Sequence, residues 1–162
     1  MSARLWFVAH TRPRREKKLV DFCSREVIPA TLPCYSSGHK YRGKTVVFRK
    51  PLFPGYVFLQ LQDGERETVR QNEHVANLLN VFDQETFQAQ LDDILHALDS
   101  ELDVRLAPSI GEGMRVRIAS GPLQGTEGWV ESRYGMSTVL LRLDFINQAA
   151  AVKVDADQLE LI

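Results

Sequence analysis

Hydrophobic and polar positions along the chain follow two different periods, and each period predicts its own kind of element. Residues 5–9 alternate within a run of aromatic and branched side chains, which is typical of a β-strand. A helix is expected next, because Thr11 suits the N-cap and Pro13 suits the first turn, where a missing N–H costs little. At about 100° per residue, the buried side of this helix is predicted to carry Leu19, Val20, Cys23 and Val27.

The following stretch predicts a hairpin and a further strand. Two prolines end the helix, and an irregular strand or loop over 31–41 leads to a hairpin with its turn at 42–44. Branched and aromatic side chains make 45–48 the second strand of this hairpin. Two more prolines bar ladder pairing just afterwards, so the next strand is expected at 55–61.

The next forty residues predict helices over an antiparallel sheet. Residues 65–72 suit a short polar helix and residues 75–82 a further apolar segment. A longer helix should start after the N-cap Asp83, with one acidic side. Its apolar positions, which are spaced for packing on a sheet, are Phe87, Leu91, Ile94, Leu95 and Leu98. The order of elements predicts an α+β domain over residues 1–100.

The last third of the chain changes in character. Proline and glycine mark residues 101–113 as a linker. Short strand-like runs separated by turns then predict a five-stranded, SH3-like β-barrel over residues 114–162. The expected strands are 114–118, 128–132, 138–143, 150–154 and 159–162.

Composition fits a globular chain and argues against several classes of protein. With 162 residues and 44% hydrophobic residues, the chain can bury real cores. No apolar run approaches the roughly 20 residues that span a bilayer, and the start lacks signal-peptide features, so a cytoplasmic protein is expected. Two cysteines outside any CxxC pair and four scattered histidines predict neither a disulfide scaffold nor a metal site, and no cofactor is expected.

The net charge of −1 conceals a strong polarity along the sequence. Residues 1–62 carry twelve basic and three acidic side chains, whereas residues 63–104 carry two basic and eleven acidic ones. This asymmetry is typical of a protein that meets a polyanion on one side only. Two solvated faces of opposite sign would give the same composition, so charge alone leaves both interpretations open.

A first motif lies in residues 116–130, within the predicted barrel. An apolar strand is followed by a Gly-Pro-Leu turn at 121–123, and glycines recur at Gly125 and Gly128. Glycine suits such turns because positive φ and close backbone approach cost it nothing. The spacing resembles the KOW motif, which occurs in ribosomal proteins and in NusG relatives. By itself it implies a module that binds RNA or protein.

A second motif separates these two families. Pro51-Leu52-Phe53-Pro54-Gly55-Tyr56-Val57-Phe58 is preceded by Leu5-Trp6-Phe7-Val8-Ala9-His10-Thr11 and by the helix start Arg12-Pro13-Arg14-Arg15-Glu16-Lys17. Together these segments resemble the N-terminal domain of NusG transcription factors. The resemblance covers nearly the whole chain, because the order of domains and the position of the linker also agree.

The resemblance implies that the first domain docks on the clamp helices of the largest RNA polymerase subunit through an apolar pocket. Sheet core is the alternative role for the side chains at the matching positions, and alternation along the strand fits both roles. The matching residues are Trp6, His10, Phe53, Tyr56 and Phe58.

Two further contacts are implied on other parts of this domain. Thr68 and Arg70 match a stretch that touches the gate loop of the second-largest subunit. Specialised relatives often have a His-Thr-Thr triplet here, whereas this sequence has Arg66-Glu67-Thr68. Because of this difference, an ordinary solvated helix is an equal alternative. Basic residues match positions near upstream or non-template DNA, where phosphate contacts would add affinity without reading sequence. These basic residues are Arg12, Arg14, Lys18 and Arg25, extended by Lys40, Arg42 and Lys44 at the hairpin tip.

In the predicted barrel, Phe145, Ile146 and Asn147 align with the loop through which family members bind ribosomal protein S10 or the termination factor Rho. An exposed Phe-Ile pair would form an interaction patch. The alternative is that both apolar residues face the interior of the barrel.

These observations lead to one functional hypothesis. The sequence contains no catalytic constellation, P-loop or dinucleotide fingerprint, so no enzyme is expected. The resemblance implies a monomeric elongation and antitermination factor that holds the polymerase clamp closed, suppresses pausing and tethers a second partner through its KOW barrel. The Arg-Gly-Lys hairpin favours an operon-specific, RfaH-like paralogue, although a β-fold is expected for the terminal domain. A KOW-containing ribosomal or structural RNA-binding protein is the alternative.

Overall fold

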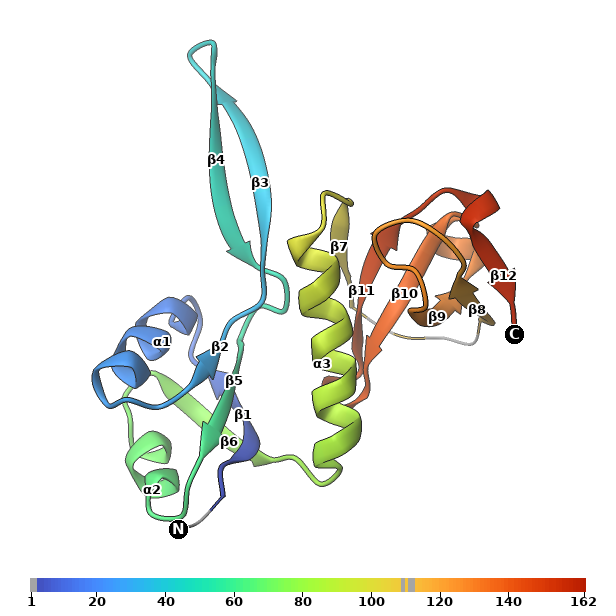
Figure 1. Ribbon diagram of the computed structural model, residues 1–162. Coiled ribbons are helices and arrows are strands. Elements are labelled where there is room, and N and C mark those ends of the chain that lie inside the picture. Colours follow the sequence, from blue (N-terminus) through green and yellow to red (C-terminus); the bar gives the residue numbers. More distant parts are fainter. Residues whose placement is uncertain (1–2, 109, 111–112) are drawn as a thin grey trace. The chain divides into compact units, whose positions relative to one another are not determined.

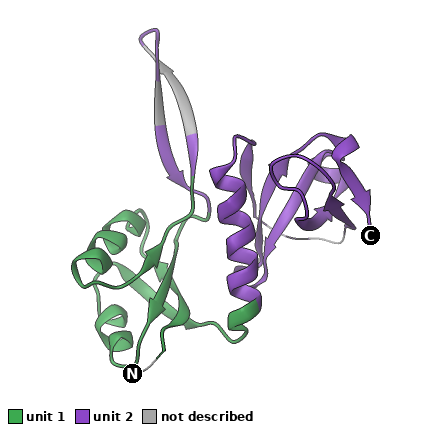
Figure 2. Ribbon diagram, viewed as in Figure 1, with its two compact units in different colours: residues 1–34, 53–85 green, residues 35–52, 86–162 purple. Residues whose placement is uncertain are grey.

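The computed structural model describes residues 3–108, 110 and 113–162, and of residues 37–41, 46 and 47 it describes the backbone alone. The chain divides into two compact units, one made of residues 1–34 and 53–85 and the other of residues 35–52 and 86–162 (Figure 2). Each unit has its own sheet and is described separately below.

The first unit is a four-stranded antiparallel sheet in the order β2-β5-β1-β6, with two helices on one face (Figure 1). The elements are β1 (Leu5–Thr11), α1 (Glu16–Arg25), β2 (Ala30–Thr31), β5 (Tyr56–Leu61), α2 (Glu65–Arg70) and β6 (Val75–Asn80). The predicted strand at 5–9, the strand at 55–61 and the short polar helix are confirmed within two residues at each end.

The start of the first helix was predicted wrongly. Thr11 is the last residue of β1, and its N–H donates to the Gly55 carbonyl at 2.8 Å. Thr11 therefore belongs to the sheet and does not cap the helix. The chain then turns through Arg14 at φ 61°, and α1 begins at Glu16 with Arg15 in the N-cap position. The helix is therefore shorter than the sequence suggested.

At the end of α1, the buried face differs from the prediction. Leu19 and Cys23 are fully buried as expected, but Val27 lies beyond the helix and is 80% exposed. Its φ of 58° is left-handed, and the N–H groups of Val27 and Ile28 donate to the carbonyls of Ser24 and Cys23. This is a Schellman motif, a helix ending that usually places glycine where Val27 stands. Ile28 enters the core instead.

The second unit holds a two-stranded hairpin, a long helix and a six-stranded sheet (Figure 1). The hairpin pairs β3 (Cys34–Tyr41) with β4 (Lys44–Pro51), around the predicted turn. The helix α3 (Gln84–Asp99) starts where Asp83 predicted and buries Phe87, Leu91 and Ile94. Except for its first two residues, α3 groups with the C-terminal sheet, whereas the sequence suggested packing on the sheet of the first domain.

The C-terminal sheet runs in the order β12-β8-β9-β10-β11-β7, and its neighbouring strands are antiparallel. Five strands match the five runs expected from the sequence, with ends that shift by up to two residues. The sixth, β7, lies inside the expected linker and pairs with β11. The strands are β7 (Val104–Ala107), β8 (Met114–Ile118), β9 (Glu127–Val130), β10 (Thr138–Leu143), β11 (Gln148–Lys153) and β12 (Leu159–Leu161).

The glycines of the 116–130 motif have different physical roles. Gly125 has φ +91°, a conformation that side chains other than glycine rarely adopt. Gly128 is required for space, because a Cβ there would lie 2.6 Å from Val139 Cγ1 and 2.7 Å from the Leu140 carbonyl oxygen. Gly125 therefore serves the turn between β8 and β9, whereas Gly128 lets β9 lie close to β10.

Candidate functional site

The sheet of the first unit has two faces of different character. Side chains of Phe7, Ala9, Val57 and Leu59 point to the face that α1 and α2 cover, and they form one apolar cluster with Leu19 and Cys23 of α1. Because side chains alternate along a strand, the neighbouring positions occupy the opposite face. This resolves which strand positions pack the helices of this unit, a question that the alternation of the sequence left open.

The opposite face gathers the aromatic residues that the sequence singled out. On paired strands, His10 lies beside Tyr56 and Val8 beside Phe58, and Trp6 occupies the same face of β1 two residues before Val8. The rings of His10 and Tyr56 stack at 5.2 Å between centroids, with 20° between their planes. Phe53 joins through its contact with Phe58, at 6.3 Å and 59°.

Burial divides this aromatic group into two parts. Phe53 and Phe58 are 1% and 0% exposed, and Trp6 is 8% exposed, so these three rings have the burial of core residues. Tyr56 is half-buried and His10 is exposed. The stacked pair of His10 and Tyr56 is therefore the part of the group whose rings a partner can reach in this structure.

Backbone contacts hold the stacked pair in place. The Tyr56 N–H donates to the Phe53 carbonyl at 3.2 Å, which closes a turn before β5. Within that turn, the Gly55 N–H donates to a carboxylate oxygen of Glu16 at 3.1 Å. Gly55 has φ +89°, a conformation that other residues rarely adopt, and a Cβ there would lie in ordinary van der Waals contact with the His10 ring at 3.5 Å.

Two residues that support this surface were missed by the sequence analysis. Glu16 is 8% exposed, and as the first residue of α1 it resembles any acidic residue in a first helical turn. Gln84 accepts from the Trp6 N–H at 2.6 Å through Oε1 and donates to the Trp6 carbonyl at 3.0 Å through Nε2. Neither contact could be read from spacing, because each partner is far away in the sequence.

Thr68 and Arg70 lie elsewhere on the first unit. Both are exposed on α2, and Arg70 forms an exposed ion pair with Glu67 at 3.3 Å. The buried Val69 of the same helix belongs to the cluster beneath α1 and α2. The structure therefore places these two residues on the helical side of the sheet, apart from the aromatic group.

The basic residues form two groups and not one stripe on a helix. Lys18 and Arg25 are exposed on α1, whereas Arg12 and Arg14 are exposed in the turn that precedes it. Arg12 donates from Nε to the Glu73 carbonyl at 3.2 Å. A third basic residue of the same turn, Arg15, was not singled out by the sequence analysis, and its Nη1 lies 3.2 Å from Nδ1 of His74.

The hairpin contributes further basic side chains that can be placed, and among them Lys44 is exposed at the start of β4. Arg42 is exposed at the turn between β3 and β4, with φ 51°. Lys40 lies within β3, and its side chain falls outside the described residues.

In the second unit, the residues expected to bind another partner lie in the short 3-10 helix η2 (Asp144–Ile146) and just after it. Ile146 is 9% exposed, so the expected exposed Phe-Ile pair is wrong for this residue, which faces inward. Phe145 is half-buried, and its ring meets the edge of the Phe87 ring at 6.3 Å. Asn147 is exposed with φ 52°.

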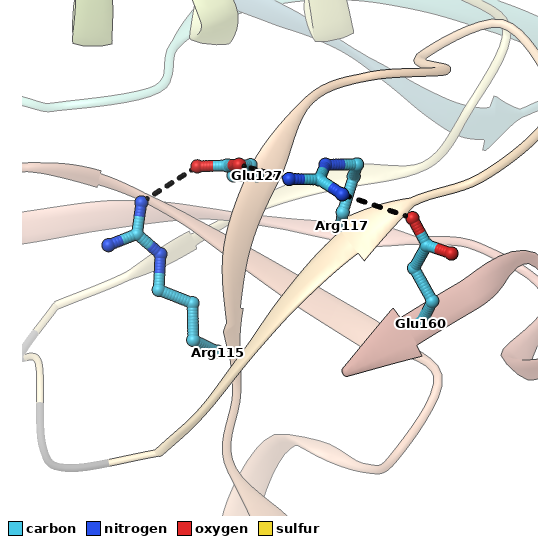
Figure 3. Close-up of polar contacts among 4 residues, drawn as sticks. All are labelled: Arg115, Arg117, Glu127 and Glu160. Atoms are coloured by element: carbon cyan, nitrogen blue, oxygen red, sulfur yellow. Dashed lines mark hydrogen bonds and ion pairs between the residues drawn. The ribbon is translucent and has the colours of Figure 1, made fainter. Parts of the chain in front are cut away.

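An ion-pair network also crosses the C-terminal sheet (Figure 3). Glu127 of β9 accepts from Arg115 and Arg117 of β8 at 2.9 and 3.0 Å, and Arg117 reaches Glu160 of β12 at 3.3 Å. Hydrogen bonding from Arg117 lowers the pKa of Glu127. The groups are solvated, so the network orders the side chains more than it stabilises the fold.

Among the described residues, no group of three or more His, Cys, Asp and Glu side chains could hold a metal ion. Among the described helices, none has the length and apolar character needed to cross a membrane.

Comparison with protein families identifies the first part of the chain. The family model described as transcription termination factor nusG matches residues 4–94, which is more than half of the 162 residues. The chain belongs to the NusG family. No curated protein in the comparison matches it. The family match extends from β1 to within α3 and includes the aromatic face of the first sheet, and it gives the chain a role in transcription elongation or termination.

Proposed function

We propose that this NusG-family chain is an elongation and antitermination factor that docks on the clamp helices of RNA polymerase through the aromatic face of its first sheet. The observation that carries the proposal is the stacked pair of His10 and Tyr56, which lies on the sheet face opposite α1 and α2 and within the family-matched residues. Binding across the polymerase cleft would hold the clamp closed and suppress pausing.

Basic side chains on the first unit would add contacts with upstream or non-template DNA. Arg14, Lys18 and Arg25 are exposed, so they can reach phosphates without losing a buried partner. Contacts of this kind raise affinity for any sequence and weaken with salt. Thr68 and Arg70 are assigned to a separate contact with the gate loop, because they lie on α2 and not on the aromatic face.

The C-terminal sheet would bind a second protein through Phe145 and Asn147, with ribosomal protein S10 and Rho as the candidates. The two modest contacts would then be joined in one chain, which gives avidity that neither contact has alone. The features that favour an operon-specific, RfaH-like factor are the hairpin and the sequence that follows it.

The polymerase proposal is tested by affinity of the full chain for core RNA polymerase, with an isolated clamp-helix fragment as competitor. We expect the fragment to displace the chain and the chain to shorten pauses in a transcription assay. Binding that the fragment does not displace would rule out this docking site. Co-sedimentation with ribosomes in the absence of polymerase would favour the alternative, a KOW-containing ribosomal or structural RNA-binding protein.

The phosphate contacts are tested by the salt dependence of binding to an elongation complex. Replacing Arg14 and Lys18 with Ala should lower the slope of log K against log salt by about 0.7 to 0.9 for each phosphate that the variant no longer neutralises. Lys153→Ala is the matched control, because Lys153 is exposed on β11 of the other unit. An unchanged slope in the double variant would assign Arg14 and Lys18 to the solvated surface.

A further inference from the structure

An apolar groove lies beside β12 in the C-terminal sheet. It encloses about 280 Å³ and is lined by residues of β8, β9, β12 and the turns next to them. Three of its apolar side chains are exposed to solvent: Met114 at 47%, Met136 at 53% and Leu161 at 70%. Methionine adapts its shape to different neighbours, so this surface suits apolar side chains of a partner.

The same region has an open backbone edge. β12 ends the sheet, and among the described strands it pairs with β8 alone (Figure 1). The Ile162 N–H donates to the Arg115 carbonyl at 3.3 Å, which marks a hydrogen-bonded pair of this antiparallel ladder. Such pairs recur at every second residue, so Glu160 also directs its backbone groups at β8, whereas Leu159 and Leu161 direct theirs away from it. Main-chain donors and acceptors for one further strand therefore lie at this edge.

The side chains along this edge alternate in character. Because neighbouring residues of a strand point to opposite faces, Leu159 and Leu161 share one face, and both line the groove. Glu160 lies between them, and its carboxylate contacts Arg117 at 3.3 Å (Figure 3). The Glu160 side chain is 51% exposed, so the carboxylate can accept from a second donor.

Charge selects among the possible occupants of this edge. Residues 155–162 contain Asp155, Asp157 and Glu160, all exposed, and the sequence there has neither Lys nor Arg. A second copy that added its own β12 by twofold antiparallel pairing would set one Glu160 opposite the other, and like charges at such positions are destabilising. A basic residue opposite Glu160 would instead complement it.

We propose that the edge of β12 and the adjoining groove bind an extended segment of another protein, in which large apolar residues alternate with Lys or Arg. The segment forms hydrogen bonds with the backbone of Leu159 and Leu161, places its apolar side chains in the groove and sets its basic side chain opposite Glu160. This site and the partner surface assigned to Phe145 and Asn147 lie on different elements, so the inference does not depend on that assignment.

A synthetic peptide tests the site in the full-length chain. Its Leu-Lys-Leu core matches the three residues of β12 and is flanked by Gly and Ser, and a second peptide differs only by Glu in place of Lys. In an NMR titration, we expect the Lys peptide to shift the amide signals of Leu159 and Leu161 and to bind about tenfold more tightly than the Glu peptide. Equal affinity for the two peptides, or shifts confined to other parts of the chain, would overturn the proposal.

Reversal of one charge tests the recognition of the basic residue. Glu160→Lys should bind the Glu peptide more tightly than the Lys peptide, because attraction and repulsion are exchanged. Asp103→Lys is the matched control: Asp103 precedes β7 at the other edge of the sheet, is exposed and pairs with Arg105 at 3.4 Å. This control should keep the wild-type preference, with both variants folded by thermal unfolding. A folded Glu160→Lys that still prefers the Lys peptide would contradict the assigned contact.

Leu161→Ser tests the groove without a change of charge. Because Leu161 is 70% exposed, the variant should unfold at the wild-type temperature, whereas both peptides should bind it more weakly. Undiminished binding of the peptides would remove the groove from the site and overturn the proposal. Sedimentation velocity should show the wild type as a monomer, and a dimer that Leu161→Ser abolishes would assign the edge to a second copy instead.

Discussion

The ring of Phe53 packs against the ring of Phe58 with 6.3 Å between centroids, and both side chains are almost completely buried. This contact gives Phe53 the role of a core residue, so Phe53→Ala should lower the free energy of unfolding by about 3 to 5 kcal/mol. Chemical denaturation of the full chain measures the loss. A variant of unchanged stability would show that the ring is held against the partner surface and not in the core.

Tyr56 offers the sharper test of polymerase docking, because its ring is half-buried and stacked on the exposed His10 ring. Tyr56→Ala should reduce affinity for core polymerase by about 2 kcal/mol or more, which is roughly thirtyfold, because aromatic anchors dominate such interfaces. Its melting temperature should fall less than that of Phe53→Ala. The half-buried Tyr134, in the other unit, provides the matched control. Full affinity in a folded Tyr56→Ala would exclude this residue from the docking surface.

Val27→Gly is expected to stabilise the chain. A branched side chain at φ 58° is strained, whereas glycine adopts this conformation at no steric cost and is the usual residue of a Schellman ending. Val27 is 80% exposed, so little burial is lost. The strain removed from the folded chain should outweigh the entropy that glycine adds to the unfolded chain, so the free energy of unfolding should rise by about 1 kcal/mol. Thermal or urea unfolding of the variant and the wild type measures this difference in stability. A decrease in the variant would mean that the Val27 side chain has a packing role.

Cys23 should react slowly with thiol reagents, and its ionisation should lower the stability of the fold at alkaline pH. Burial, and secondarily the charge of Glu65, raises the pKa of this thiol from 9.0 to about 11. Since the unfolded chain releases the proton first, the stabilising contribution is complete below about pH 9 and is lost between pH 9 and 11. Cys23→Ser should flatten this part of the stability profile. Labelling of Cys23 as fast as the half-buried Cys34 would contradict the assigned burial.

Local patterns predicted the strands of the first unit well, and the errors fall where long-range pairing decides the backbone. Thr11 has the chemistry of an N-cap, but the Gly55 carbonyl, which is distant in the sequence, keeps its N–H in the sheet. Helical periodicity equally assigned Val27 to a buried face, because the sequence does not reveal a left-handed residue that ends the helix. Such contacts require the tertiary fold.

The candidate sites show the same division. Alternation brought Tyr56 and Phe58 to one face, because the period of a strand fixes this for residues two positions apart. That His10 joins them depends on the register between β1 and β5, which the sequence does not reveal. Alternation could not separate the buried Phe58 from the reachable Tyr56. The α3 contact with η2 was also outside its reach, since Gln90 and Asp144 are 54 positions apart and carry no motif.

Asp93 should make the packing of α3 against the C-terminal sheet sensitive to pH. Burial, and then the neighbouring Asp92 and Glu127, raises the pKa of this carboxyl above 3.8, and His96 opposes them in part. The cationic Arg115 and Arg142 line a cavity together with Asp93. A raised pKa means that the folded chain holds this proton more tightly than the unfolded chain does.

The packing of α3 is therefore most stable while Asp93 is neutral, and it weakens as the pH rises through the raised pKa. The Asp144 amide donates to Oε1 of Gln90 on α3 at 2.9 Å and so reports on this packing. We expect its protection factor, which corrects for the intrinsic rate of exchange, to fall as the pH increases over this interval. Asp93→Asn stays neutral at every pH, so it should keep a high and constant protection factor. A protection factor that falls equally in the wild type and in Asp93→Asn would assign the pH dependence to another group.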